Sequence, residues 1–377
     1  MSDVFITRVA KYLPNEPVSD DEMEGILGMV NGHPSRSRKI VLRQNGIHTR
    51  YYALNKQGQM THNNAQVTAE AIKNLSDEHF SPQDIELLCC GTSSPDQLVP
   101  SHASMVHGVL KNRPSELNSP SGICCSGMQA MKYGYLSVKS GNTSNAVCTG
   151  SETVSFGLCA HKFAMEMEAR DALEEQPVLA FEKDFLRWML SDGAGAMLMQ
   201  NEPRGPVSLR VEWIELLSFA NELEVCMFGG CEKQPDGTLR TFHSFNSETV
   251  GKKSLTTLQQ DVRLLNENIV RYGVKSLSLS AQKRKVQPGE VDYFLPHFSS
   301  QYFRKPLAEA MEKGGVGVPA EKWFTNLDRV GNVGAASIYL ALEELVNSGK
   351  LREGQRIWLA VPESGRFTFA QSLLTVC

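Results

Sequence analysis

The sequence predicts an α/β protein made of two similar halves, each with a central β-sheet. Apolar strand-like runs alternate with amphipathic helical runs, which is typical of α/β folds. Two segments of the first half recur in the second half, in the same order and at nearly equal separations. The chain has 377 residues, 41% of them hydrophobic, which is enough for two lobes of similar size. We therefore expect one half over residues 1–200 and another over residues 201–377.

The first repeated segment consists of a turn, an acidic residue, a buried strand and a Ser-Ser loop. It occurs at 82–94 and again at 288–300, which is a separation of 206 residues. The second is a helix ending in Ser-Gly, at 126–141 and at 334–349, which is a separation of 208 residues. A polar loop and a strand follow each helix, at 145–148 and 356–361. Any two α/β segments share some features, but the near-equal separations favour duplication.

Helical spacing of apolar residues predicts six helices, and one segment falls outside the repeat. The helices are expected at 67–75, 101–110, 126–140, 255–272, 302–313 and 335–348. The Gly-rich run 191–196 predicts a turn that feeds a strand at 197–199. Residues 159–190 are helical in pattern and rich in Met and aromatic residues. This insertion either packs against the core or caps a substrate tunnel or dimer surface, and the cap is favoured because insertions on repeated folds tend to carry function.

Charge and cysteine content exclude several classes of function. The formal net charge is −4 and the pI is about 6.2, so the basic field needed to bind nucleic acid is missing. An acidic carrier protein remains compatible, since docking needs only a local basic patch. No apolar run approaches the ~18 residues of a membrane span. The nine cysteines include no CxxC pair and follow no signal peptide, so we expect free thiols, no metal and a cytoplasmic location.

The most informative stretch is 122–127, Gly-Ile-Cys-Cys-Ser-Gly, which opens a predicted helix. The first N–H groups of a helix lack internal partners and the dipole is positive there, so a thiolate is favoured at this position. Cys125 stands immediately at the helix start and is the candidate nucleophile. The alternative is that Cys124 and Cys125 are both small buried residues, which is the usual situation of a free cysteine.

Three further positions could complete a site around this thiol. His297 is a candidate base or hydrogen-bond donor, and duplication would place it near the pseudo-two-fold axis, opposite the Cys125 helix. Asn332 is either a helix N-cap or an amide donor to a thioester or enolate oxygen. Gly365 follows a buried strand, in a tight turn that either aims a backbone N–H at an oxyanion or is only a turn.

These motifs resemble the thiolase superfamily, and within it the ketosynthase III group (β-ketoacyl-acyl-carrier-protein synthase III). The resemblance covers the whole chain. It rests on these segments, in the order in which the family has them: 43–50 with Gly-Ile-His-Thr-Arg, 91–94 with Pro100-Ser101, 125–127, 191–196, 296–297, 328–332 and 364–368. It implies a layered α-β-α-β-α thiolase fold, a homodimer and no cofactor, with substrates delivered as coenzyme A or acyl-carrier-protein thioesters. It also implies that Cys125 is acylated, that His297 and Asn332 stabilise the attacking enolate, and that the N–H groups of Cys125 and Gly365 form the oxyanion hole.

The sequence departs from the family in ways that resemble a narrower subgroup. His297 is followed by Phe-Ser-Ser, the glycine turn carries Arg366 and is preceded by Glu363, and the insertion is longer than in fatty-acid priming enzymes. These features are similar to the ketosynthases that build dialkylresorcinol and bacterial stilbene precursors in secondary metabolism. Those enzymes join a β-ketoacyl thioester to an α,β-unsaturated acyl thioester and close a cyclohexanedione ring.

Ring closure needs a second proton transfer, and Glu152 is the candidate base. It follows a buried strand, and a carboxylate in an apolar tunnel has a raised pKa that suits a base near neutral pH. The alternative is a polar residue at a strand end. Arg304 and Lys305, on the helix after His297, are candidates for binding phosphopantetheine or an acidic carrier protein, although charged residues on an exposed helix are usually just solvated.

Three rival functions remain open at the level of sequence. The first is fatty-acid or polyketide priming by condensation of acyl-coenzyme A with malonyl carrier protein. The second is a Cys-His thioesterase or acyltransferase, against which Asn332 argues because hydrolysis has less need of an enolate donor. The third is a catalytically silent scaffold subunit, against which the intact Cys, His and Asn set argues.

Overall fold

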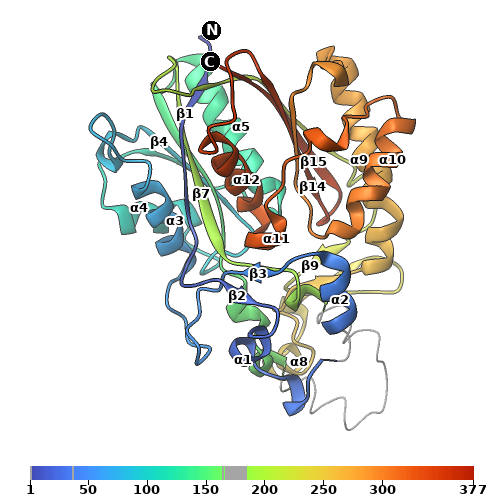
Figure 1. Ribbon diagram of the computed structural model, residues 1–377. Coiled ribbons are helices and arrows are strands. Elements are labelled where there is room, and N and C mark those ends of the chain that lie inside the picture. Colours follow the sequence, from blue (N-terminus) through green and yellow to red (C-terminus); the bar gives the residue numbers. More distant parts are fainter. Residues whose placement is uncertain (1, 36–37, 164, 166–184) are drawn as a thin grey trace.

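A nine-stranded mixed sheet runs through the whole molecule (Figure 1). The computed structural model describes residues 2–35, 38–163, 165 and 185–377. Within them the strand order is β13-β14-β15-β8-β1-β7-β6-β4-β5. The strands are β1 (Phe5–Tyr12), β4 (Leu87–Thr92), β5 (Glu116–Asn118), β6 (Asn145–Glu152), β7 (Gly193–Gln200), β8 (Leu209–Ser218), β13 (Tyr293–Pro296), β14 (Arg356–Glu363) and β15 (Thr368–Val376).

The strand order of the first half is repeated in the second half. From the outside inward, β4, β6, β7 and β1 match β13, β14, β15 and β8. In each set the first two strands are parallel and every later pair is antiparallel. A short antiparallel contact between β1 and β8 joins the two half-sheets. The topology thus repeats as the duplicated segments predict, and the expected boundary at 200/201 falls directly after β7.

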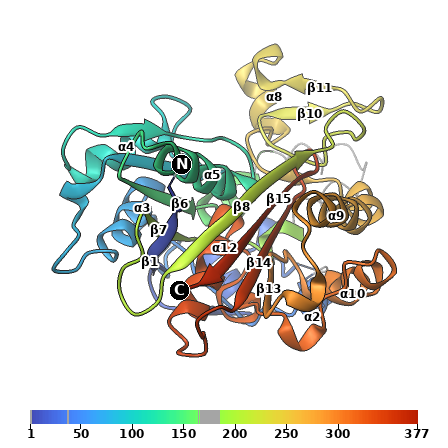
Figure 2. The same ribbon diagram turned by 90° about the horizontal axis from the view of Figure 1, so that it is seen from above.

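Helices and half-sheets form five layers, so the predicted α-β-α-β-α arrangement is confirmed. Helices α5 (Cys125–Ser140) and α12 (Ser337–Val346) lie in the middle layer: α5 contacts β4 and β6 on one side and β14 and β15 on the other. Helix α3 (Asn64–Lys73), with α4 (His102–Leu110) packed on it, covers the first half-sheet. Helix α9 (Val262–Arg284), with α10 (Arg304–Lys313), covers the second, and Figure 2 shows the two outer layers on opposite sides of the molecule.

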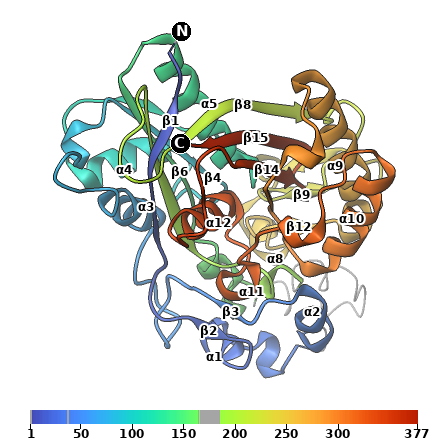
Figure 3. The same ribbon diagram turned by 45° about the horizontal axis from the view of Figure 1, so that its top comes forward.

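Smaller elements gather at one end of the layered body, as Figure 3 shows for α1, α2, β2 and β3. They are α1 (Met23–Leu27), α2 (Arg38–Asn45), β2 (Val18–Ser19), β3 (Thr49–Arg50), β9 (Met227–Phe228), β10 (Cys231–Lys233), β11 (Leu239–Thr241), α8 (Ser247–Lys252), β12 (Gln259–Gln260) and α11 (Leu327–Val330). None of the helices in the described part of the chain is long and apolar enough to span a membrane.

Most predicted helices match observed ones to within a few residues, but two predictions are wrong in part. The helix expected at 255–272 begins only at Val262, because the Asp261 side chain caps it by accepting from Leu264 N–H (2.9 Å), and it continues to Arg284. Its first apolar residue, Leu255, is buried from a turn instead. The turn expected at 191–196 is wrong beyond Asp192, because Gly193 already begins β7.

In the middle layer, backbone segments of the two halves pack directly against each other. A Cβ placed on Gly150, in β6, would lie 2.1 Å from Ala335 O, just before α12. A Cβ on Gly127, in α5, would lie 2.3 Å from the same oxygen. Glycine at both positions therefore lets the start of α12 press against β6 and α5.

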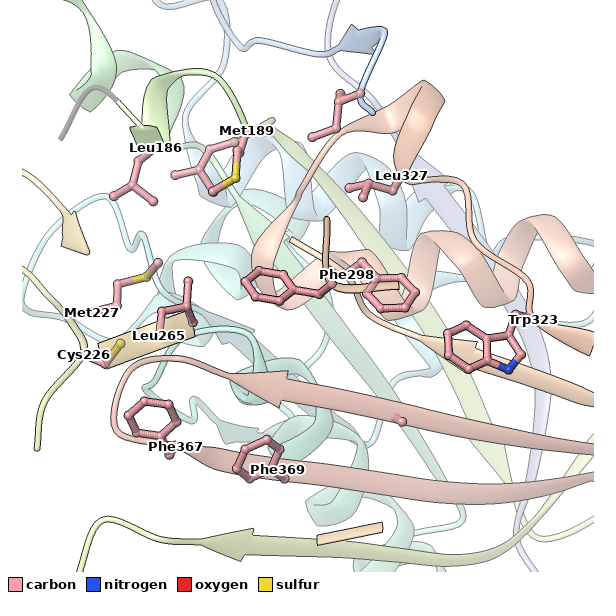
Figure 4. Close-up of a cluster of buried hydrophobic side chains, with 14 of the residues drawn as sticks. Leu186, Met189, Cys226, Met227, Leu265, Phe298, Trp323, Leu327, Phe367 and Phe369 are labelled. Carbon is pink, nitrogen blue, oxygen red and sulfur yellow. The ribbon is translucent and has the colours of Figure 1, made fainter. Parts of the chain in front are cut away.

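A large apolar cluster fills the second half beside the sheet. Figure 4 shows part of it: Leu186 and Met189, Met227 and Leu265, and the rings of Phe298, Phe367 and Phe369. These side chains come from segments far apart in sequence, including the described end of the insertion. The cluster therefore connects the layered body with the smaller elements around it.

Candidate active site

Cys125 is the first residue of α5, as the sequence predicts, and its side chain is fully buried. The thiol donates to Val361 O (3.3 Å), in β14, and lies 3.5 Å from Thr368 O, in β15. The start of α5 therefore directs Cys125 at the strand ends of the opposite half. Cys124 precedes the helix as its N-cap residue and is also buried.

The expectation that the helix start favours a thiolate at Cys125 is wrong for this structure. Glu363, the last residue of β14, places Oε2 at the helix start, where it accepts from Cys125 N–H (3.0 Å) and Ile123 N–H (3.1 Å). Burial, and next the Glu363 carboxylate, raise the pKa of the Cys125 thiol well above its usual range. Burial of the thiol and the nearby carboxylate thus oppose the effect expected from free N–H groups, and burial also raises the pKa of Glu363 itself.

The glycine turn after β14 does approach the start of α5. A Cβ on Gly365 would lie 3.1 Å from Ile123 Cγ1 and 3.3 Å from Glu363 Oε1. The carbonyl of Gly365 faces the other way and accepts from Cys226 N–H (2.9 Å). The glycine turn at Gly365 therefore lies beside the start of α5, where Glu363 accepts from the Cys125 N–H. The role of Gly365 and Cys125 as an oxyanion hole stays a prediction.

His297 follows β13 directly, and its N–H continues the parallel ladder by donating to Ala360 O (2.8 Å) in β14. The residue is 5% exposed, and burial lowers the pKa of its imidazole to about 4. The ring is therefore neutral near pH 7 and suited to donate or accept one hydrogen bond. Since Ala360 precedes Val361, the end of β14 connects His297 with the Cys125 thiol.

Burial of neutral His297 predicts a loss of stability in acid. The unfolded state takes up the proton near the ordinary pKa of 6.5, whereas the folded state does so only at about 4. The wild-type protein should therefore lose about 2 kcal/mol more than His297→Gln when pH falls from 7 to 5. Urea unfolding of both proteins at the two pH values measures this difference, and equal losses would show that His297 titrates normally.

Asn332 lies in the loop before α12 and makes a tight local turn. Its Oδ1 accepts from Gly334 N–H (3.0 Å), while its backbone bonds to Met189 O (3.1 Å) and Ser191 N–H (2.9 Å). The helix-cap alternative is wrong, because Val333 and Ala336 occupy the cap positions. Within the described residues, its Nδ2 has no hydrogen-bond acceptor, so the amide stays available as the predicted donor.

Glu152 ends β6 just as Glu363 ends β14, and it reaches across to the other half in the same way. It accepts from Ala335 N–H (3.1 Å) at the short helical turn before α12. Ser93 Oγ (2.7 Å), Ser94 Oγ (2.6 Å) and Ser93 N–H (3.2 Å) complete its shell. Burial raises the pKa of Glu152, and the serine hydrogen bonds oppose that shift. Its predicted role as a base would require one of these partners to be given up.

Two motifs of the resemblance hold the surrounding loops together. Asp192, from the run 191–196, is fully buried and accepts from the N–H groups of Ala53 (2.7 Å) and Val154 (2.7 Å). Burial raises the pKa of Asp192 to about 6. Arg50, from the run 43–50, is also fully buried, donates to Trp188 O (2.7 Å) and pairs with Asp20 (2.6 Å). These residues order the loops next to β7 rather than adding groups to the site.

The remaining predicted functional residues lie on the surface and in the insertion. Arg304 begins α10, and its guanidinium lies 5.8 Å from the Trp323 ring, while the Lys305 side chain is 88% exposed and lies 3.9 Å from Glu309. The cap expected over 159–190 falls mostly on residues outside the described ranges. Across the described residues, no group of three or more His, Cys, Asp or Glu side chains is arranged to hold a metal.

The layered fold, with a buried cysteine at the start of a central helix, is the α/β arrangement of thiolase-fold proteins. Two solved structures support this: a tetronic acid condensing enzyme, AbyA1 (TM-score 0.76, 17% identity, 99% of each chain), and Xanthomonas campestris OleA (TM-score 0.73, 19% identity, 99% of each chain). At these identities the likeness shows the fold, and the predicted thiolase fold is confirmed.

Sequence comparisons show which proteins of this fold the chain resembles. Residues 281–373 match the family model "3-Oxoacyl-[acyl-carrier-protein (ACP)] synthase III C terminal". β-Ketoacyl-[acyl-carrier-protein] synthase III of Aquifex aeolicus is 25% identical over 365 residues, 96% of each chain. Synthase III 2 of Deinococcus radiodurans is 26% identical over 280 residues, 73% of this chain and 69% of the relative. The chain is therefore similar in sequence to ketosynthase III proteins, over its C-terminal part in the family model and over most of its length in the relatives.

Glu363 is the site residue to which the sequence interpretation assigned no role. The sequence does contain a signal for this residue, because the repeated strands 145–152 and 356–363 both end in glutamate. Aligning these two strands would have paired Glu363 with Glu152 and directed attention to both carboxylates.

Proposed function

We propose that this protein is a condensing enzyme that joins a β-ketoacyl thioester to an α,β-unsaturated acyl thioester and closes a cyclohexanedione ring. One new bond arises from attack of a carbanion on a thioester carbonyl. The other arises from addition of a carbanion to the conjugated double bond. Holding one partner on Cys125 as a thioester divides this condensation into easier steps.

The observation that carries the proposal is an apolar cavity beside His297. It lies between α9, α10 and the strands β13 to β15, and it includes Val361, whose carbonyl accepts from the Cys125 thiol. An acyl chain on Cys125 would find apolar room next to a neutral imidazole. The lining residues are Ile269, Val270, Gly273, Leu277, Phe294, Pro296, His297, Phe298, Ser299, Phe303, Leu307, Ala360, Val361, Pro362, Phe369, Ala370 and Gln371.

Similar proteins lend further support to acyl thioester chemistry. OleA was solved with lauric acid and lauroyl-CoA bound, and AbyA1 is described as a tetronic acid condensing enzyme. Acyl-coenzyme A or acyl carrier protein would deliver the substrates here. Arg304 and the exposed Lys305, at the start of α10, would bind an acidic carrier protein or the phosphate of its pantetheine arm in this proposal.

The decisive experiment offers the protein a β-ketoacyl and an enoyl carrier thioester together and identifies products by mass. A cyclohexanedione that requires both substrates is expected. Glu152→Gln should then accumulate a linear condensation product if Glu152 is the ring-closing base. Ring formation by Glu152→Gln at the wild-type rate would remove Glu152 from that role.

Priming by condensation of acyl-coenzyme A with malonyl carrier protein is the second candidate. The names of the sequence relatives favour it. The same assay includes malonyl carrier protein with an acyl-coenzyme A. Malonate-dependent chain extension without any ring product would overturn the cyclising proposal. Thioester hydrolysis alone would support a thioesterase, and turnover of no thioester would support a scaffold subunit.

A further inference from the structure

Glu363 is a buried carboxylate in the place where a substrate oxygen is expected. It is 7% exposed, and its Oε2 accepts from both Ile123 N–H and Cys125 N–H at the start of α5. The second of these N–H groups is the one that the resemblance assigns to the oxyanion hole. A site that stabilises an oxyanion is therefore already filled by an anion of the protein itself.

The pseudo-symmetric Glu152 shows how a structural carboxylate would be held at such a position. Its oxygens accept from Ser93, Ser94 and Ala335, so both are satisfied. The corresponding serines of the second half serve other partners: Ser299 lines the apolar cavity, and Ser300 accepts from Tyr302 N–H (3.2 Å). Glu363 Oε1 consequently has no hydrogen-bond donor among the residues that the structure describes.

Among the residues that the structure describes, no cation acts on Glu363 to fix its charge, and burial raises the pKa of its carboxyl group. The groups that face it from α5 are the thiols of Cys124 and Cys125, each with its pKa raised by burial and then by Glu363. β15 offers no titratable group at this point, and Arg366, in the same turn, donates instead to Leu223 O (3.2 Å). Glu152, from β6, acts on Cys124. Glu363 is thus held by two backbone N–H groups and by burial.

We propose that Glu363 is a gate on the nucleophile: its carboxylate occupies the Cys125 N–H until a substrate displaces it. When the carboxylate leaves, two things change together. The N–H groups become free to bind an anionic oxygen, and the charge that opposes a thiolate moves away. A resting Cys125 is therefore protected from alkylating and oxidising reagents.

The acylation step that follows rests on the proposed function. The Cys125 sulfur forms a bond to the acyl carbon, the bond from that carbon to the donor sulfur breaks, and the thiol proton of Cys125 leaves with the donor thiol. The tetrahedral oxygen takes the N–H that Glu363 has vacated. Glu363 is a positioning residue in this step, since it acts through Cys125 and its N–H.

The test measures alkylation of Cys125 without any substrate. Wild type, Glu363→Gln and Glu363→Ala are treated with neutral iodoacetamide and with anionic iodoacetate from pH 6 to 10. Modification is read by peptide mass spectrometry with fragmentation, and Cys124→Ser and Cys125→Ser identify the modified thiol. Glu215→Gln is the matched control, because it makes the same carboxyl-to-amide change at an equally buried glutamate of the second half, in β8, that pairs with Lys283 and Arg284 outside the site.

In Glu363→Gln the pH midpoint of alkylation should fall by about one unit, which gives about tenfold faster reaction with iodoacetamide at pH 7.5. Iodoacetate should gain more than iodoacetamide, because the substitution removes the negative charge that repels its carboxylate. Glu363→Ala should behave likewise if the amide variant folds poorly. Rates within twofold of wild type, equal gains for both reagents, or the same gain in Glu215→Gln would each overturn the gate.

A second arm follows formation of the acyl-enzyme by intact mass. Glu363→Ala should be acylated faster than wild type at low thioester concentration. If wild type forms no acyl-enzyme, the proposed function fails, while the alkylation rates still decide the role of Glu363.

Discussion

Replacement of Cys125 by alanine should remove the acyl-enzyme and reduce condensation on the order of 10³-fold or more. The thiol is the only nucleophile at the start of α5 that points at the strand ends Val361 and Thr368, next to the cavity that contains His297. Without it, the two condensing partners would have to react directly, and the covalent division of the reaction would be lost. Incubation with an acyl thioester, followed by intact mass measurement, detects the missing adduct.

Cys124→Ala is the matched control for this experiment. Cys124 is the N-cap residue of α5 and precedes the nucleophile by one position, so it carries the same thiol at a different place in the chain. Its replacement should leave acylation within about threefold of wild type. An acyl adduct that persists in Cys125→Ala and disappears in Cys124→Ala would reverse the assignment. Circular dichroism of both variants separates loss of chemistry from loss of fold.

Gly150→Ala should cause a larger loss of stability than Gly127→Ala, the other substitution that adds a methyl group at this contact in the middle layer. The new Cβ would lie 2.1 Å from Ala335 O and 2.6 Å from Ala335 C, which are backbone atoms of the opposite half. Relief requires β6 and the start of α12 to separate, so we expect about 3 kcal/mol of destabilisation or failure to fold. Urea unfolding, or the yield of soluble protein where unfolding cannot be followed, measures the effect.

Gly108→Ala provides the opposite control. Gly108 lies inside α4, and a Cβ there would meet nothing within 4 Å. Alanine favours a helix over glycine by up to about 1 kcal/mol, so this variant should be equal to or more stable than wild type. Equal destabilisation by both substitutions would contradict the close approach at Gly150 and indicate a general sensitivity to glycine replacement.

The fold was predictable from sequence because repetition carries long-range information. Two segments repeated at separations of 206 and 208 residues pointed to paired half-sheets, and the strand order bears this out. Helix limits were less predictable where a polar residue overrode apolar spacing. Asp261 caps α9 and so removes Leu255 and Leu258 from a helix that their spacing favoured.

The position of the candidate nucleophile in the fold was predictable from sequence, but the carboxylate beside it was not. The position of Cys125 at the start of α5 follows from the local pattern of glycines and apolar residues. The state of its thiol depends on Glu363, which is 238 residues away in the chain. The sequence around Cys125 cannot show which side chain of the other half will accept from a free N–H at the helix start. Comparison of the two repeats, rather than of either one alone, would have been needed.

The contacts between the halves also bear on how the chain reaches its native state. Glu152 bonds to Ala335 across 183 residues, Tyr339 Oη to Gly127 O across 212 and Cys125 N–H to Glu363 across 238. Each central helix is thus completed only by the half to which it does not belong. Closing loops of this length is entropically costly and makes folding slow. A nascent first half leaving the ribosome therefore lacks the Glu363 contact at the start of α5 until the last strands are made, and its surface that faces the second half stays uncovered for that interval.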